Sequence, residues 1–212
     1  MDEKTPGLIL RTRLLTETSL IVQWLTPELG RVATVAKGAR RAKSPFRGKL
    51  DLFHLADVSF ARSRRSELHT LREVLLRDTH PALRRDLRLL QQASYFAQLV
   101  EQTTETETPL PGMFELMMGT LSFLSRTPPG PLTVLAFEVK LLTLLGLQPD
   151  PAQTRLDAGM RSVLGQLTQG DWEALGVIRL SAAQETGLGQ FLHGFLIYHL
   201  GRLPPGRASA LG

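Results

Sequence analysis

Residues 7–37 decide the fold and read GLILRTRLLTETSLIVQWLTPELGRVATVAK. Most of this stretch is rich in leucine, isoleucine, valine and threonine in short runs, which is typical of β-strands. The segment TPELG at 26–30 is typical of a turn, because Pro27 fixes φ and Gly30 accepts a positive φ. Similar runs continue beyond the stretch. The predicted strands are 7–15, 19–26, 31–37, 53–60 and 67–74.

Five short strands with no helix between them predict a small antiparallel sheet or a closed barrel. A closed barrel is favoured, because closure removes the exposed strand edges of a small sheet. In the first strand Leu8 and Leu10 fall on one side of a period of two, and Ile9, Arg11 and Arg13 fall on the other. This alternation predicts one apolar face and one cationic face.

After residue 81 the apolar period changes from two to about 3.6, which predicts helices. Ser181 followed by Gln184 resembles a capping box, and the helix that it begins is expected to end near Gly201. The predicted helical stretches are 83–100, 114–124, 132–145, 159–167 and 181–201. We therefore expect a mixed β-then-α chain, with a barrel domain at 1–80, an all-α domain at 81–205 and a flexible tail at 206–212.

The composition is that of a globular protein and excludes several kinds of site. The chain has 212 residues, of which 42% are apolar and 21% charged, and it has no cysteine. Disulfides, thiolate zinc sites and cysteine nucleophiles are therefore excluded. No apolar run reaches the roughly 18 residues that span a membrane, and the start MDEKTPGLIL is unlike a secretory signal. We expect a cytoplasmic protein without membrane association.

Positive charge is concentrated in the first part of the chain. Residues 1–80 hold 15 Lys+Arg against 9 Asp+Glu, whereas the remainder holds 10 against 11. The formal net charge of +5 therefore comes entirely from the predicted barrel. Such an asymmetry points to a polyanionic partner, with nucleic acid as the first choice and an anionic membrane surface as the second.

The densest positive stretch is GRVATVAKGARRAKSPFRGK at 30–49, which contains no acidic residue. Phe46 lies inside it, where a nucleic-acid base could stack. Self-repulsion makes such a density unfavourable without an anionic partner. A solvated loop that binds nothing is the alternative. Together with Arg11 and Arg13 of the first strand, the candidate nucleic-acid-binding residues are Arg31, Lys37, Arg40, Arg41, Lys43, Arg47 and Lys49.

Signs of catalysis are weak, and we expect neither an enzyme nor a cofactor. The chain has no G-x-S-x-G motif and no pair of histidines at a helical spacing of four. Glu101, Glu105 and Glu107 cluster locally at a predicted helix end, whereas a metal-dependent nuclease needs carboxylates that converge from separate elements. This acidic run is expected to be a solvated face.

At this point the residues resemble those of a known family. GLILRTR at 7–13, ETSLIV at 17–22, GRV at 30–32, AKGARR at 36–41 and SPFRGKL at 44–50 are similar to the N-terminal domain of the RecO family of DNA repair proteins. FEVKLLTLLGLQP at 137–149 and the segment 195–202 resemble the helical half of that family more loosely. The resemblance covers nearly the whole chain.

The resemblance implies an OB-fold barrel followed by a helical domain. It implies binding of single- and double-stranded DNA and annealing of complementary strands. It also implies two protein partners: RecR, with which the family helps to load the recombinase RecA, and the single-strand-binding protein that coats the DNA. The acidic C-terminal tail of the latter docks on the helical domain in some members, and Lys140 is the one nearby cation that we nominate here.

This sequence departs from its relatives at one place. Many of them carry a four-cysteine zinc module after the segment that corresponds to 146–149, whereas Thr154 and Asp157 stand here near the expected position of a cysteine pair. No zinc module and no metal are therefore expected.

Three other functions remain open from the residues alone. The chain could be a protein-docking adaptor of the repair machinery, with the helical domain as its working surface. It could be an RNA-binding OB protein, since small basic barrels also serve in translation. A metal-dependent nuclease is the most distant of the three.

Overall fold

The computed structural model describes residues 2–150, 152 and 154–212. The chain forms two compact units. The first holds the residues up to Pro81 together with Val100–Phe114, and the second holds Ala82–Leu99 with Glu115–Gly212. The all-α domain expected at 81–205 was to contain residues 100–114. The segment Val100–Phe114 instead groups with the barrel, for reasons that its contacts make clear below.

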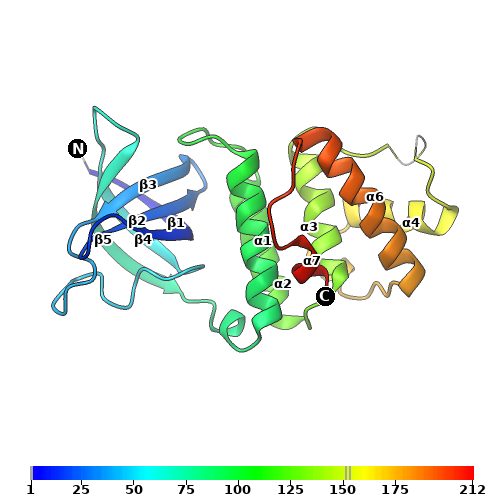
Figure 1. Ribbon diagram of the computed structural model, residues 1–212, viewed down its shortest axis with the longest axis horizontal. Helices are drawn as coiled ribbons and strands as arrows, with labels where there is room; N and C mark the ends of the chain where they lie inside the picture. Colours follow the sequence, from blue (N-terminus) through cyan, green and yellow to red (C-terminus); the bar gives the residue numbers. More distant parts are fainter. Residues whose placement is uncertain (1, 151, 153) are drawn as a thin grey trace. The chain divides into compact units, whose positions relative to one another are not determined.

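The first unit is a closed barrel, as predicted (Figure 1). Its strands follow each other around the barrel in the order β1-β2-β3-β5-β4. All neighbouring strands are antiparallel except β3 and β5, which are parallel and pair over only a few residues from Ala33 to Val35. The strands are β1 (Asp2–Leu14), β2 (Leu20–Thr26), β3 (Gly30–Ala36), β4 (Leu55–Ala61) and β5 (Leu68–Asp78).

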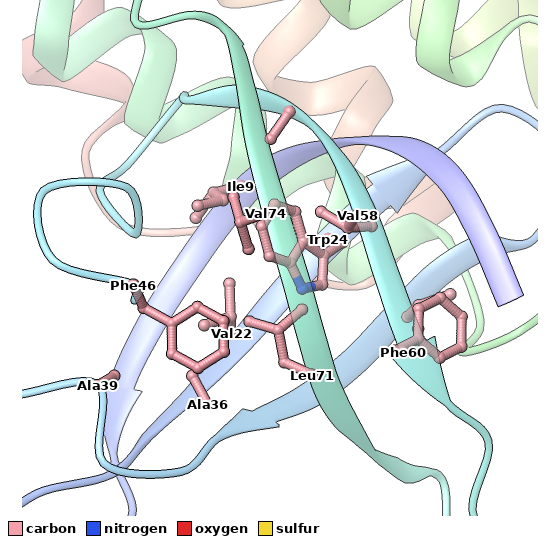
Figure 2. Close-up of a cluster of buried hydrophobic side chains, with 12 residues drawn as sticks. Ile9, Val22, Trp24, Ala36, Ala39, Phe46, Val58, Phe60, Leu71 and Val74 are labelled. Atoms are coloured by element: carbon pink, nitrogen blue, oxygen red, sulfur yellow. The ribbon is translucent and has the colours of Figure 1, made fainter. Parts of the chain in front are cut away.

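The barrel is filled by apolar side chains from every strand (Figure 2). Trp24 lies at the centre and is fully buried. Its indole Nε1–H donates to the Oγ1 of Thr34 at 2.8 Å, so the one polar group of the largest core side chain is satisfied. Phe60 lies toward one end of the core, and Phe46 reaches the core from the loop after β3.

The prediction that Ile9 shares an outer, cationic face with Arg11 and Arg13 is wrong. Ile9 is fully buried in the barrel core, whereas both arginines are exposed. The register of β1 against β2 shifts between Ile9 and Arg11. A bulge of this kind changes which face the following side chains take, so the strict alternation read from the sequence fails at this point.

Helices make up the second unit and continue into the first. The elements after the barrel are a 3-10 turn (Pro81–Arg84), α1 (Leu87–Thr103), α2 (Met113–Arg126), α3 (Pro131–Leu144), α4 (Ala158–Gln169), α5 (Trp172–Leu175), α6 (Ala182–Leu200) and α7 (Arg207–Leu211). The predicted capping box is confirmed, because Ser181 and Gln184 exchange their two hydrogen bonds at the start of α6. Gly201 follows the helix at φ 74°, as a helix stop requires.

The core of the second unit forms around α3, which is buried on most of its surface. Leu135, Val139 and Leu142 of α3 pack with Leu164 of α4 and Leu192 of α6. Helices that are apolar almost all round need such a central position. Among the described residues, none of the helices combines the length and hydropathy that a bilayer crossing requires.

The end of the chain differs from the flexible tail expected at 206–212. Residues Arg207–Leu211 form α7, and Arg207 is buried. Its guanidinium donates to both carboxylate oxygens of Glu138 in α3, at 2.7 and 2.9 Å, and to the carbonyl oxygen of Gly189 at 3.1 Å. A buried carboxylate requires a hydrogen-bonding partner of opposite charge. The pairing of Arg207 with Glu138 therefore holds residues 207–211 in an ordered helix.

Candidate nucleic-acid interface

The basic loop (residues 37–49) has a fixed backbone. Several N–H groups along the loop donate to carbonyl oxygens three residues earlier, including Arg41 to Gly38, Ser44 to Arg41 and Lys49 to Phe46, each at 3.0 Å. Gly38 and Gly48 both adopt positive φ, at 65° and 71°, which residues with a side chain rarely do. The loop is therefore a series of tight turns, and its cations are presented from an ordered backbone.

Three contacts anchor the basic loop to the barrel. The Gly38 N–H donates to the Oγ of Ser19 at 3.2 Å, and the Lys49 ammonium donates to the carbonyl oxygen of Val74 at 3.0 Å. Phe46 is the third anchor, because only 7% of it is exposed and it packs with the barrel core near Val22 (Figure 2). The expectation that Phe46 offers an open face for base stacking is therefore wrong, since its ring is used to hold the loop down.

Most cations of the basic loop lack an acidic partner. Lys37, Arg41 and Lys43 are exposed, and no carboxylate in the described part of the chain pairs with them. Arg40 and Arg47 are also exposed and contact carbonyl oxygens alone, those of Glu17 at 2.9 Å and Ala42 at 3.5 Å. The positive charge of the loop is thus not neutralised within the protein, and several guanidinium and ammonium donors face solvent.

Two other candidate cations are tied to a segment after the barrel. Arg11 forms an ion pair with Glu101. Arg31 donates from Nε to the Oγ1 of Thr104 at 2.8 Å and from Nη2 to the carbonyl oxygen of the same residue. Burial lowers the pKa of Arg31, and the nearby carboxylates of Glu101 and Glu105 raise it in opposition. Arg13 is exposed on β1.

The acidic segment (residues 101–107) lies along the barrel, which explains its place in the first unit. The Glu107 N–H donates to the carbonyl oxygen of Arg31 at 2.8 Å, and Thr106 forms a parallel bridge with Arg31. The Glu107 carboxylate contacts the buried ring of His69. The segment therefore pairs with the start of β3 at Arg31, before the residues of β3 that pair with β5. It is not the solvated face expected from the sequence.

Sequence reasoning missed this role of the acidic segment, although a signal is present. Residues 103–108 read TTETET, an alternation of β-branched and charged residues that is typical of a strand. Nothing in the local pattern identifies Arg31 as the partner, which lies 73 positions earlier in the chain than Thr104.

Lys140, the candidate for partner binding, is occupied within the second unit. Its ammonium group donates to the carbonyl oxygen of Gly170 and lies 5.7 Å from the ring centroid of Trp172. Burial lowers the pKa of Lys140, and the carboxylate of Asp171 raises it in opposition. The side chain therefore links α3 to the start of α5.

The region in which the resemblance implied a departure from a zinc module holds a helix cap. The Oδ1 of Asp157 accepts from the Met160 N–H at 2.7 Å at the start of α4. Pro151 and Gln153 of this region lie outside the described residues. Within the described ranges, no group of three or more His, Cys, Asp or Glu side chains is arranged to hold a metal ion.

The fold and the loop together define a class of protein: an OB-type barrel with a protruding cationic loop, followed by a helical unit. Two family models match the chain, "Recombination protein O N terminal" over residues 1–80 and "Recombination protein O C terminal" over residues 84–153. The chain belongs to the RecO family. The barrel followed by helices that the resemblance implied is thereby confirmed.

Several curated relatives carry the name "DNA repair protein RecO". The protein of Rhodopirellula baltica is 34% identical over 143 residues, which is 68% of this chain and 53% of the relative. That of Dehalococcoides mccartyi is 32% identical over 149 residues, 70% of this chain and 58% of the relative. That of Anaeromyxobacter sp. strain K is 34% identical over 158 residues, 74% and 60%. The matches thus span a little over half of the length of these relatives.

Proposed function

We propose that this chain is a DNA repair protein that binds single- and double-stranded DNA through the basic loop. The observation that carries the proposal is the ordered set of cations at Lys37, Arg40, Arg41, Lys43 and Arg47, which no acidic side chain of the described residues neutralises. An ordered loop loses little conformational entropy on binding. Its contacts fall on phosphates, so affinity for different base sequences is expected to be similar.

Annealing of complementary strands follows from the same chemistry. Two strands repel each other through their phosphates, and cations held on a barrel surface reduce this repulsion when they lie between the strands. Counterions released from the strands supply much of the binding free energy. No nucleotide hydrolysis and no metal ion are needed for a step of this kind, since base pairing itself drives it.

Family membership supports two protein partners as part of the proposal. These are RecR and the C-terminal tail of single-strand-binding protein, with which the chain would help to load a recombinase onto coated DNA. Lys140 is not included in this interface, because its ammonium group already donates within the second unit. The basic loop would then hold the DNA while other surfaces contact these proteins.

A salt series of binding measurements tests the proposal. If four to six loop cations contact phosphates of a single strand, a plot of log affinity against log salt has a slope of about −3 to −4. Replacing Lys37, Arg40, Arg41 and Lys43 together by alanine should weaken binding to all sequences alike and flatten this slope. The annealing rate of complementary strands should fall in parallel.

The matched control removes the same charge from other exposed positions. Replacement of Arg64, Arg72, Arg126 and Arg161 by alanine changes the net charge equally and leaves the basic loop intact. We expect a much smaller loss of affinity. Equal losses in the two quadruple variants would reduce the effect to net charge, and an unchanged affinity in the loop variant would contradict the proposal.

Two further measurements address the other functions considered. Strands of DNA and RNA with equal sequence, titrated side by side, separate a DNA-binding from an RNA-binding barrel, and a strong RNA preference would contradict a role in DNA repair. Capture of partner proteins before and after nuclease treatment separates direct protein docking from bridging by DNA.

A further inference from the structure

We infer that a hollow beside the basic loop accepts an unpaired base of the bound DNA strand. The inference rests on the proposed function, because the same loop holds the strand by its phosphates. It adds a second kind of contact to the phosphate contacts, and it predicts that an unpaired strand is bound more tightly than a duplex.

The hollow lies entirely within the first unit and has a volume of about 630 Å³. Leu20 of β2 and Leu50, both partly buried, supply most of the apolar lining, and Phe46, of which only 7% is exposed, adds a small part of it. Phe46 and its neighbours belong to the barrel core at the end that the loop covers (Figure 2). The wall is therefore supported by packed side chains, and a base seated there would contact a surface that does not need to rearrange.

Three arginines line the same hollow: Arg40, Arg41 and Arg47. Arg40 and Arg47 are held by carbonyl oxygens, at 2.9 and 3.5 Å, with further N–H groups left to donate. Binding of phosphate groups alone would require only these N–H donors and no apolar wall. The combination of arginines with an apolar wall fits a whole nucleotide better, since a base has an apolar face and the two non-bridging oxygens of its singly charged phosphate accept from guanidinium groups.

Polar groups that suit the edge of a base also line the hollow. The Nδ1 of His54 lies 3.1 Å from the carbonyl oxygen of Lys49, and a carbonyl only accepts, so this nitrogen is the donor and Nε2 is the polar ring atom that this contact does not use. The carboxylate of Asp51 also lines the hollow; its Oδ1 accepts from the Leu52 N–H at 2.8 Å, and a carboxylate has several lone pairs with which to accept further hydrogen bonds. Amino groups of bases are donors, so acceptors in a cationic site match a base rather than a second phosphate.

Base pairing decides which form of DNA can use the hollow. In a duplex the base edges are paired and the faces are stacked, and entry of a base would first require its removal from the stack at a cost of a few kcal/mol. In a single strand this cost is largely absent. Duplex DNA is therefore expected to use the cations of the loop alone, whereas a single strand uses the cations and the hollow.

A comparison of two strands of equal length tests the inference on the unaltered protein. One strand carries bases, and the other is abasic throughout, so that both present the same phosphates. Burial of the face of a base against this apolar wall predicts a several-fold preference for the strand with bases. Equal affinities would overturn the inference and leave phosphate binding intact, whereas failure to bind either strand would overturn the proposed function.

A variant that fills the hollow gives an independent test. Ala42 is exposed and lines the hollow, and Ala42→Leu adds bulk without changing charge and without an aromatic face on which a base could stack. This variant should lose much of the preference for the strand with bases, with its affinity for duplex unchanged. Ala61→Leu, at the end of β4 and not among the lining residues, is the control and should keep the preference. A preference fully retained in Ala42→Leu would contradict the inference, and the abasic comparison decides the matter if that variant fails to fold.

Discussion

Arg207 and Glu138 form a buried, two-pronged ion pair between the end of the chain and the central helix of the second unit. The guanidinium Nε and Nη2 donate to the two carboxylate oxygens at 2.7 and 2.9 Å. The hydroxyl of Tyr95 donates to the same carboxylate at 2.6 Å, and Glu138 is fully buried. Three elements that are distant in the sequence, α1, α3 and α7, are therefore joined at one carboxylate.

Removal of the arginine from this network should destabilise the second unit strongly. Among the described residues, Arg207→Met leaves Tyr95 as the remaining hydrogen-bond donor to the buried Glu138 carboxylate. Loss of one member of a buried pair lowers the free energy of unfolding by about 3–5 kcal/mol. Urea unfolding followed by circular dichroism measures the change. The double variant Arg207→Met with Glu138→Leu should lose less than the single one, and a single variant as stable as the unaltered protein would show that the pair contributes little.

Alkaline pH should weaken the same network through Tyr95. Burial and the neighbouring Glu138 carboxylate raise the pKa of Tyr95 above its ordinary value of 10.0. The folded state then keeps a proton that the unfolded state loses, so this contribution is complete below pH 10 and declines above it by about 1.4 kcal/mol per pH unit. Unfolding measured between pH 9 and roughly 11 should show a shallower decline in Tyr95→Phe. Equal slopes for the two proteins would contradict the prediction.

Gly30 should tolerate substitution less well than Gly48, although both have a positive φ, of 65° and 71°. A Cβ at Gly30 would overlap the Thr108 carbonyl group, with 2.6 Å to its carbon, whereas nothing lies within 4 Å of a Cβ at Gly48. Gly48→Ala should therefore cost only the backbone strain of about 1–2 kcal/mol, and Gly30→Ala should cost more. Thermal unfolding of the two variants measures the difference. Similar losses of stability in both variants would mean that the backbone at Thr108 shifts at little energetic cost to accommodate the Cβ.

Neutralisation of Glu101 should strengthen DNA binding. The ion pair with Glu101 occupies Arg11, whose side chain is about half exposed, and phosphate has to compete with the carboxylate for it. Glu101→Gln removes this competitor, so we expect a several-fold gain in affinity and a steeper dependence on salt. Glu115→Gln, in a different helix, makes the same change of charge and is the control. An equal gain in both variants would assign the effect to net charge.

Much of the fold follows from local sequence patterns. The period of two in the first strands, the TPELG turn at 26–30 and the change of period after residue 81 were sufficient to predict a barrel followed by helices. Ser181 with Gln184 predicted the start of α6 correctly, because a capping box is made by residues that are close in the chain. The cations of the basic loop were also visible, since their density is a property of composition.

The errors arose where distant residues decide the outcome. Phe46 sits in a polar, basic stretch, yet the end of the barrel needs an apolar plug and takes this ring. Arg31 lies in a stretch whose composition suggests unpaired cations, but its guanidinium donates to Thr104, which lies 73 positions away in the sequence. The bulge after Ile9 depends on how β1 pairs with β2. Local periodicity carries no information on such pairings, because they depend on which segments meet in space.

The placement of Val100–Phe114 with the barrel has a practical consequence for anyone who wishes to transplant this domain. The first unit is not one continuous segment of the sequence, because its last stretch begins within α1. A fragment cut after Pro81 would leave Arg31 without Thr104 and His69 without Glu107. A graft onto another scaffold therefore has to bring both pieces and join them with a spacer that replaces the intervening residues.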